Sequence, residues 1–288
     1  AVGPGARVDV PGDARVIDLA GHTVIPGIVG LHDHTFYTTA TRRVQITETA
    51  PKLYLASGVT TIRTTGSYHP YSELNLRRAI QAGRAVGPRM YVTGPYITGA
   101  TTGSMTAITS PEDARRVVAY WAEEGVDWMK AYTTIGRDEL AAAIDEAHAR
   151  GIRMTGHLCS VSFREAVALG IDNLEHGFFT NTDYHPGRGP DECPDEFRRG
   201  LLEVEIDSDE VRATFDDMID NGVALTSTLA IYELLVPGRP PLEQRTLDAL
   251  APESREDYLR SREEIAKDAD TSIWPELFRK AQAFERAF

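Results

Sequence analysis

Four histidines and one lysine occur in this sequence at positions that suit a metal site. His32 and His34 end an apolar run, and alternate residues of a strand point to the same side, so both imidazoles can face one centre. Lys130, His157 and His176 each follow another short apolar run. Imidazole nitrogens bind zinc and similar divalent cations. The five residues therefore predict a site for such a cation.

The last three of these residues lie at matched distances from a preceding glycine. Lys130 lies five residues after Gly125, and each of the two histidines lies six residues after its own glycine, Gly151 or Gly170. Ligands around the mouth of a barrel would be encoded in this way, because the active sites of such barrels gather where the strands end. Any one of the histidines taken alone is better explained as a core or rim residue. The matched set favours a shared site.

A helix that ends in glycine and is followed directly by a short apolar strand occurs six times. The glycines of this repeat are Gly58, Gly87, Gly125, Gly151, Gly170 and Gly222. Glycine just after a helix accepts the left-handed conformation that ends it. Strands that alternate with helices predict βαβ units and a parallel sheet. With an earlier strand within residues 23–31, the pattern predicts seven strands, one fewer than a closed eight-stranded barrel needs.

We therefore predict an α/β fold, a (β/α)8 TIM-type barrel of which about seven strands are present. Residues 1–22 are expected to be part of a small β subdomain, with short strands at 7–10 and 15–18. Residues 23–288 are expected to form the barrel without its eighth strand, and 253–288 to be helical. We interpret the sequence as incomplete at its C-terminal end, and at its N-terminal end as well. A doubly wound open sheet is the competing fold, but its Gly-rich phosphate loop is lacking.

Composition excludes several classes of partner. The net charge is −13 and no basic stripe is present, so neither nucleic acid nor an anionic membrane surface is an expected partner. No apolar run approaches the roughly 20 residues that a membrane span needs. Cys159 and Cys193 are too few for a disulfide framework, and no CxxC pair indicates a cysteine-based metal site. The compartment is poorly determined, with the cytoplasm favoured over secretion.

The residues around these strand ends resemble the amidohydrolase superfamily. Residues 24–34 are similar to its opening strand, and residues 128–132, 155–158 and 174–177 are similar to its fourth, fifth and sixth strand ends. The resemblance covers roughly residues 15–235 in the right order. It is closest to the imidazolonepropionase-like and prolidase-like enzymes, which cleave amide bonds. The motifs are specific for the superfamily and much less specific for a substrate.

The resemblance implies a role for each residue of the site. His32 and His34 would bind one metal ion, and His157 and His176 a second, with zinc or a similar divalent metal as the ion. Lys130 would carry a carbamate that bridges the two ions, although some relatives use one. A metal-activated hydroxide would attack the carbonyl group of a small-molecule or dipeptide-like substrate. The superfamily's general-base aspartate comes from the eighth strand, and no matching aspartate is present in this sequence.

Three further side chains are candidates for contact with a substrate. Tyr132 and Tyr232 follow two of the strands and could donate to the carbonyl oxygen of the substrate, with a place in the pocket wall as the simpler alternative. Arg63 either binds a substrate carboxylate or forms an ion pair inside the barrel. The Pro- and Gly-rich stretch at 180–200 is expected to cover the substrate. The histidines without matching partners are expected to be structural or surface residues: His22, His69 and His148.

The leading hypothesis is a metal-dependent amidohydrolase that cleaves an amide or peptide-type C–N bond of a small substrate, as a metallopeptidase does. One alternative is hydrolysis of a lactone, an ester or a cyclic amidine at the same site, because the fold and the metal do not choose among these reactions. The other is a catalytically inactive metal-binding domain, which only the absent aspartate favours. A homo-oligomer is compatible with the sequence.

Overall fold

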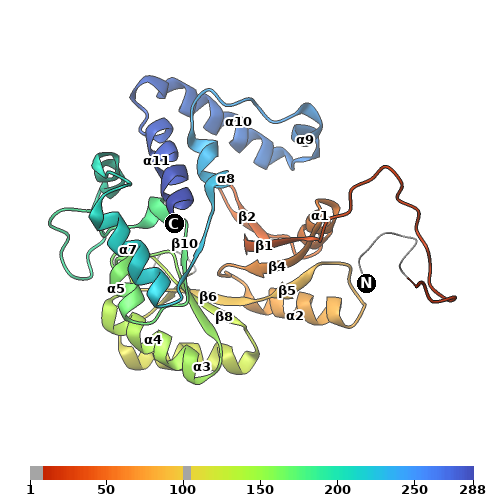
Figure 1. Ribbon diagram of the computed structural model, residues 1–288, viewed down its shortest axis with the longest axis horizontal. Helices are drawn as coiled ribbons and strands as arrows, with labels where there is room; N and C mark the ends of the chain where they lie inside the picture. Colours follow the sequence, from red (N-terminus) through yellow and green to blue (C-terminus); the bar gives the residue numbers. More distant parts are fainter. Residues whose placement is uncertain (1–8, 100–104) are drawn as a thin grey trace.

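The protein has a mixed α/β fold with parallel sheets at its centre. The structure is a computed structural model that describes residues 9–99 and 105–288. Helices α2 (Pro70–Gln81), α3 (Pro111–Glu124) and α4 (Arg137–Ala149) lie on one side of the strands, and the C-terminal helices lie on the other (Figure 1). The predicted α/β class is therefore confirmed.

In the described part of the chain, two sheets contain all the parallel strands. The three-stranded sheet has the order β1-β4-β5, with β1 (Ile28–Asp33), β4 (Val59–Thr64) and β5 (Arg89–Tyr91). The six-stranded sheet has the order β11-β10-β9-β8-β6-β7, with β6 (Thr93–Thr98), β7 (Thr106–Ala107), β8 (Trp128–Ala131), β9 (Arg153–Gly156), β10 (Asn173–Glu175) and β11 (Ala224–Thr226). A parallel bridge between Ser67 and Pro95 joins the two sheets. Apart from β7, neighbouring strands follow the chain order, as successive βα units produce.

The remaining helices surround these sheets. They are α1 (Ala50–Ala56), α5 (Phe163–Ala168), α6 (Phe197–Gly200), α7 (Asp209–Asp220), α8 (Leu229–Tyr232), α9 (Gln244–Ala249), α10 (Pro252–Lys267) and α11 (Trp274–Ala287), with short 3-10 turns η2 (Gly177–Thr180), η3 (Leu201–Glu203), η4 (Glu233–Leu235) and η5 (Ala269–Thr271). Helices α10 and α11 confirm the helical character predicted for residues 253–288. None of the helices in residues 9–99 and 105–288 is long and apolar enough to cross a membrane.

Local sequence explains where α3 begins and ends. The Ser110 side chain accepts a hydrogen bond from the backbone N–H of Asp113 at 3.2 Å, and Pro111 occupies the first turn. Gly125 ends the helix with a φ of 93°, in the left-handed region that a side chain would disfavour. The adjacent strand β8 follows within three residues. This is the repeat that the sequence predicted.

The prediction for Gly87 was wrong. The other five glycines of the repeat have a positive φ, but Gly87 does not, and Gly83 takes this conformation after α2 with a φ of 68°. A β-carbon at Gly87 would instead overlap side-chain atoms of Ile80 and Pro51. Gly87 therefore permits close packing between α1 and α2 and does not end a helix. A sequence pattern cannot separate these two uses of glycine.

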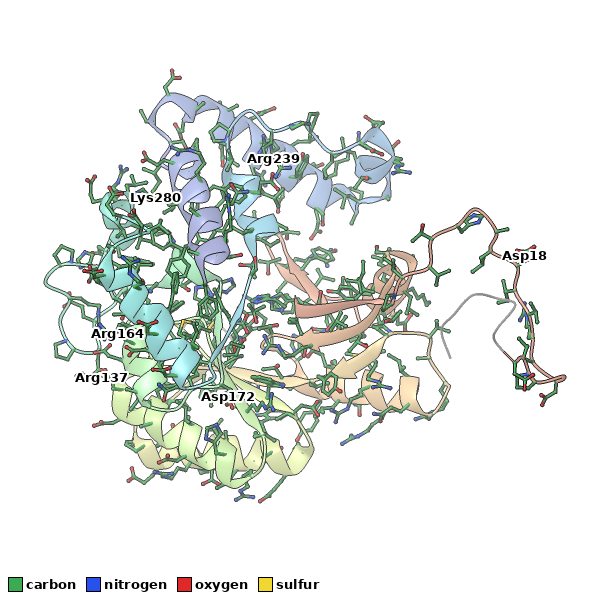
Figure 2. All side chains as sticks on the ribbon, in the orientation of Figure 1. Asp18, Arg137, Arg164, Asp172, Arg239 and Lys280 are labelled. Atoms are coloured by element: carbon green, nitrogen blue, oxygen red, sulfur yellow. A yellow bond between two sulfur atoms is a disulfide. The ribbon has the colours of Figure 1, made fainter. Side chains whose placement is uncertain are left out.

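The N-terminal segment differs from the prediction. Residues 9–27 form neither helix nor strand and are exposed, so the strand predicted at 15–18 is absent. The segment extends away from the body of the molecule, and Figure 2 shows Asp18 on it. A short strand without a partner gains no ladder hydrogen bonds, which explains its absence here. Residues 7 and 8 of the other predicted strand lie outside the described residues, and residues 9 and 10 are not in a strand.

A short hairpin follows the first parallel strand and was not predicted. Strand β2 (Phe36–Thr38) pairs in antiparallel fashion with β3 (Arg43–Gln45). Each strand has three residues, too few for the alternating pattern that identifies a strand in a sequence. The hairpin begins two residues after His34 and thus borders the region of the predicted site.

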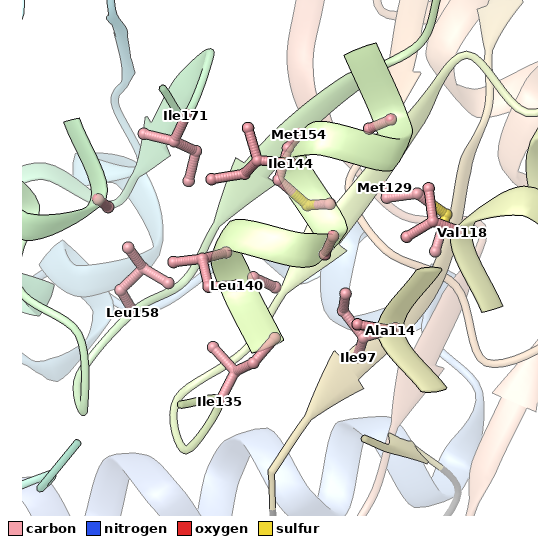
Figure 3. Packing of buried hydrophobic residues seen from close by; sticks show 14 of the residues in the cluster. Ile97, Ala114, Val118, Met129, Ile135, Leu140, Ile144, Met154, Leu158 and Ile171 are labelled. Carbon is pink, nitrogen blue, oxygen red and sulfur yellow. The ribbon is translucent and has the colours of Figure 1, made fainter. Parts of the chain in front are cut away.

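Two hydrophobic clusters stabilise the molecule. The larger cluster lies between strands of both sheets and helices α2 to α5, with Met129, Leu140 and Ile144 fully or almost fully buried (Figure 3). The second cluster joins η2, α6, α7 and α11 and includes Phe178 and Phe284. Both clusters lie close to segments that follow the carboxyl ends of the strands. Apolar packing therefore fixes the position of those ends.

A disulfide joins Cys159 to Cys193, with 4.9 Å between the two Cα atoms. This bridge was not predicted, because a pair of cysteines 34 residues apart has no characteristic spacing. The bridge ties the stretch at 180–200 to the loop that follows β9. Disulfides persist mainly in oxidising compartments. The bridge is more typical of such a compartment than of the cytoplasm. The cytoplasmic location stays a prediction.

Candidate active site

The structure brings the four predicted histidines together at the carboxyl ends of β1, β9 and β10. The ring centroids of His32 and His34 are 5.3 Å apart, and those of His32 and His176 are 4.7 Å apart. The centroids of His157 and His176 are separated by 4.3 Å. Strand β1 belongs to one sheet and strands β9 and β10 to the other. The cluster is therefore assembled from both sheets.

Lys130 joins this cluster from the buried strand β8. Only 1% of its surface is exposed, and its Nζ atom lies 5.6 Å from the centre of the Tyr96 ring. Its charge is one of the causes that lower the pKa of all four histidines. Burial lowers the pKa of Lys130 itself to about 8. A substantial fraction of this amine is therefore uncharged in mildly alkaline solution.

Burial is the largest cause that keeps the four imidazoles neutral. It lowers the pKa of His34 to about 3, and it lowers the pKa of His157 and of His176 far below the usual value. The pKa of His32 is lowered as well, although its hydrogen bond to Glu175 acts in the opposite direction. Neutral imidazole has a free nitrogen lone pair, the form that binds a metal ion.

A buried carboxylate holds His32 in place. The Nδ1 atom of His32 lies 2.7 Å from Oε2 of Glu175, and Arg63 donates a hydrogen bond to Oε1 of the same carboxylate at 2.6 Å. Thr155 and Asn173 also donate to Oε1. Burial alone would raise the pKa of Glu175, but the hydrogen bond from His32 and the charges of Lys130 and Arg63 lower it to about 2. The carboxylate is therefore charged and fully engaged.

Different contacts position the other imidazoles. Tyr54 clamps the backbone of His34, because its hydroxyl donates to the carbonyl oxygen at 2.8 Å and accepts from the N–H at 3.2 Å. His176 has a φ of 70°, a left-handed conformation that is strained for a residue with a side chain. Its Nδ1 atom lies 2.8 Å from the Thr228 hydroxyl. Among the described residues, Nδ1 of His34 and Nε2 of His176 have no hydrogen-bond partner.

The two predicted tyrosines lie at the edge of the cluster. The Tyr132 ring centroid is 4.6 Å from that of His157, and the Tyr232 centroid is 5.9 Å from that of His176. Tyr232 also stacks on Phe179, with 3.9 Å between centroids. Both positions agree with contact to a bound molecule and with a place in the pocket wall.

The structure decides between the two roles that the sequence left open for Arg63. This side chain is buried and forms an ion pair with Glu175, so it is not available for a substrate carboxylate. Among the histidines expected to lie apart from the site, His22 is exposed and His148 lies 2.9 Å from Asp172 at the surface. His69 precedes the first residue of α2.

Sequence reasoning missed three residues that position the histidines. Glu175 directly precedes His176, and a carboxylate within an apolar strand is a signal, because such a group is rarely buried without a partner. Tyr54 and Thr228 gave no signal, since each lies on a separate segment and reaches a histidine only in the folded chain. In residues 9–99 and 105–288, no three His, Cys, Asp or Glu side chains are already arranged around one point as a metal cage.

Clustered histidines and a buried lysine thus lie at the carboxyl ends of parallel strands. Many α/β proteins have their active sites at this edge of the sheet. The model of the amidohydrolase family matches residues 23–186, which is more than half of the 288 residues. The chain belongs to the amidohydrolase family, as the strand-end motifs predicted. No curated protein matches the sequence in a direct comparison.

Solved structures show similar folds. A candidate prolidase from Bifidobacterium longum has a TM-score of 0.60 at 24% identity, over 93% of this chain and 62% of that one. A bottromycin amidohydrolase has a TM-score of 0.59 at 21% identity, over 91% of this chain and 53% of that one. At such identities the likeness is one of fold. The chain spans less than two thirds of the length of either protein.

Proposed function

We propose that this chain carries the active site of a metal-dependent hydrolase that cleaves an amide or peptide-type C–N bond of a small substrate. The observation that carries the proposal is the cluster of four neutral imidazoles around one buried lysine, in a chain of the amidohydrolase family. The pKa values of these five side chains are all lowered from their ordinary values, and perturbed pKa values gather at functional sites.

The donor atoms fit zinc or a similar divalent cation. Nδ1 of His34 and Nε2 of His176 are buried without a hydrogen-bond partner among the described residues, and a buried polar atom left unpaired costs about 1–3 kcal/mol. Glu175 holds Nδ1 of His32, which leaves Nε2 as the free donor. The fit rests on these donors and on their neutral form, and not on a preformed coordination geometry.

Lys130 is proposed to become a carbamate if two ions are bound. Only an uncharged amine adds carbon dioxide, and burial lowers the pKa of this amine to about 8. The product would carry a negative charge among four neutral imidazoles. A metal ion bound by these residues would polarise the substrate carbonyl and increase the acidity of water.

Tyr132 and Tyr232 are proposed to donate hydrogen bonds to the carbonyl oxygen of the substrate. Burial is the largest cause that raises the pKa of both hydroxyls, so each keeps its proton near neutral pH. A protonated phenol can stabilise the negative charge that develops on this oxygen during attack. Both rings lie within 6 Å of a histidine ring of the cluster.

We further propose that the two sheets are the wall of a (β/α)8 TIM-type barrel. Parallel strands in chain order with intervening helices support this arrangement, as does the position of the histidines at the carboxyl ends. The division into a small β subdomain at 1–22 and a barrel at 23–288 stays part of the proposal. The bridge between Ser67 and Pro95 joins the two sheets at the point where they would meet in this wall.

A substrate panel tests the function. The full natural protein is loaded with zinc and assayed against dipeptides, N-acyl amino acids, a lactone, an ester and a cyclic amidine. Hydrolysis of the amides that stops on chelation is the expected result. Turnover of only the lactone, the ester or the amidine would favour the first alternative. Metal binding without any turnover would favour the inactive metal-binding domain.

Matched histidine variants test the site. His157→Ala is expected to lower the amount of bound zinc, which mass spectrometry measures. It is also expected to lower the rate of hydrolysis, and each quantity should fall by at least about a hundredfold. His148→Ala removes a surface histidine and should leave both within about twofold. A His157→Ala protein with full zinc and full activity would contradict the proposed site.

A further inference from the structure

A continuous row of four aromatic side chains runs from one side of the histidine cluster to the other. Each ring contacts the next, with 4.9 to 5.3 Å between centroids, in the order Phe36, Tyr68, Tyr96 and Tyr132. At one end, the Phe36 centroid is 4.7 Å from that of His34. At the other end, the Tyr132 centroid is 4.6 Å from that of His157. We call these four side chains the aromatic row.

The hairpin of β2 and β3 fixes the first two rings of the row. Phe36 follows directly after Thr35, whose hydroxyl donates a hydrogen bond to the buried Glu73 at 2.7 Å. On the second strand, Arg43 places its guanidinium carbon 3.4 Å from the centre of the Tyr68 ring, which is a cation–π contact. Phe36 and Tyr68 are therefore held in place before any ligand binds.

Gly66 lets the row cross from one sheet to the other. Its φ is 86°, and a β-carbon at this position would lie 2.4 Å from an atom of the Tyr96 ring. The next residue, Ser67, forms the bridge to Pro95 that joins the two sheets. The Tyr96 ring therefore occupies space that only glycine leaves free, and the row spans the junction between the sheets.

The aromatic row borders the site and is not part of the apolar core. Three of its rings are half-buried, as are the two histidines at its ends, and only Tyr96 is covered, with 4% of its surface exposed. In residues 9–99 and 105–288, neither hydrophobic cluster includes a ring of the row. Solvent therefore reaches apolar ring surface beside the histidines, and a ligand that covers such surface gains free energy.

We propose that the aromatic row binds an aromatic group of the substrate, attached within a few bonds of the scissile amide. This inference rests on the proposed hydrolase function and deepens it, because it names a substrate class. The row begins and ends at histidines of the cluster, so a group that lies against it is next to the proposed metal-binding nitrogens.

The contacts within the row favour an aromatic ring over an aliphatic group of the same size. Two of the three contacts are edge to face, an arrangement that aromatic pairs prefer. A planar ring of the substrate extends this series and gains the aromatic contact in addition to burial. A saturated ring gains burial alone.

Binding to the metal-free natural protein tests the row without turnover. One set of probes carries the ring on the acyl side: N-benzoylglycine, N-cyclohexanecarbonylglycine and N-acetylglycine. A second set carries it on the amine side: N-acetylphenylalanine, N-acetylcyclohexylalanine and N-acetylalanine. In at least one set, calorimetry should show phenyl binding at least about tenfold more tightly than methyl and about threefold more tightly than cyclohexyl. Equal affinity for phenyl and cyclohexyl in both sets would overturn the inference.

Variants of Phe36 assign the preference to the row, since this ring has no hydroxyl and is not a proposed hydrogen-bond donor. Phe36→Ala should lower the affinity for the phenyl probe by about tenfold. Phe36→Leu keeps apolar surface, so it should retain the preference over methyl and lose the preference over cyclohexyl. Tyr37→Ala is the matched control, because alternate residues of β2 point to opposite faces, and it should keep both preferences.

A purely structural role for Phe36 predicts a different result. If the ring only shields His34, Phe36→Ala should lower zinc binding and the affinity for all probes by the same factor, and this outcome would overturn the inference. Thermal unfolding of each variant identifies loss of folding as the cause of lost binding. The Phe36→Leu protein then decides the outcome.

Turnover by the zinc-loaded protein separates this inference from the proposed function. Phe36→Ala should raise KM for the phenyl substrate by about tenfold and leave KM for the methyl substrate nearly unchanged. Hydrolysis without any preference for phenyl would overturn the role of the row and leave the hydrolase proposal standing. A phenyl preference in binding without hydrolysis of any substrate would do the reverse.

Discussion

The two sheets hold their parts of the proposed site in different ways. In the packed arm, which we define as strands β8 to β10 with helices α3 to α5, Met129 of β8 is fully buried. In the tethered arm, which we define as strand β1 of the other sheet, Leu31 remains 54% exposed and Val29 55% exposed. Figure 1 shows the helices α3 to α5 against the packed arm.

Polar contacts replace packing in the tethered arm. His32 is held by Glu175 and His34 by Tyr54, whereas Lys130 comes from a strand inside the main core. The residue after His34, Thr35, donates a hydrogen bond to the buried Glu73 at 2.7 Å. One site can therefore depend on apolar packing on one side and on single hydrogen bonds on the other.

Loss of the Glu175 charge should have the largest effect. Glu175→Gln leaves Arg63 buried without a counter-ion, which typically costs about 3–5 kcal/mol in the free energy of unfolding. Denaturant unfolding measures this cost. Glu123→Gln, which removes an exposed partner of Arg150, should cost less than about 1 kcal/mol. Equal costs for the two variants would show that Glu175 does not anchor the tethered arm.

A leucine truncated in each arm should give the next largest difference. Leu140→Ala opens a cavity in the packed arm and should cost about 2–5 kcal/mol. Leu31→Ala removes the same atoms from an exposed position and should cost less than about 1 kcal/mol. Urea unfolding of the full natural protein compares them. A similar loss in both would mean that Leu31 is covered, and the distinction between the arms would fail.

The buried Glu73, which accepts the hydrogen bond from Thr35, should make the stability of the protein depend on pH. Burial raises the pKa of this carboxyl from 4.5 to about 7, so the folded state binds the proton more tightly than the unfolded state does. The protonated Glu73 carboxyl therefore contributes about 3 kcal/mol to the free energy of unfolding below about pH 4.5. This contribution is lost as the pH rises to about 7. The facing groups Tyr54 and Tyr96 have raised pKa values and do not titrate there.

Glu73→Gln supplies the control for that pH dependence. Its side chain cannot ionise, so unfolding curves between pH 5 and pH 8 should show wild type losing stability relative to the variant. A constant difference between the two proteins over this range would mean that Glu73 keeps an ordinary pKa and does not act as a buried neutral tether.

Removal of the Tyr54 hydroxyl should have the smallest effect on stability. Tyr54→Phe deletes the two hydrogen bonds to the His34 backbone, at about 0.5–1.5 kcal/mol each, and keeps the ring. Zinc affinity should fall more visibly, by about 10- to 100-fold, because the ligand loses its support. Tyr120→Phe, at an exposed tyrosine, is the control. Unchanged zinc affinity in Tyr54→Phe would remove Tyr54 from the site.

Much of the architecture was predictable because it depends on local signals. The glycines after helices have a positive φ at Gly125, Gly151 and Gly170, and the strands that follow them carry Lys130 and His157 near their ends. Each of these features involves a few neighbouring residues. The unpaired strand at 15–18 and the role of Gly87 were predicted wrongly, since both depend on what the segment contacts.

The sequence by itself indicated seven of the parallel strands but not β6 or β7, and it also indicated the family of the chain and the five residues that gather at the strand ends. Only the tertiary structure decided their partners. Glu175 meets His32 across 143 positions and Arg63 across 112, and Cys159 meets Cys193 in a stretch without a recognisable spacing. The reason is physical: periodicity and glycine positions record local backbone preferences, whereas hydrogen bonds between distant segments exist only after packing brings those segments together.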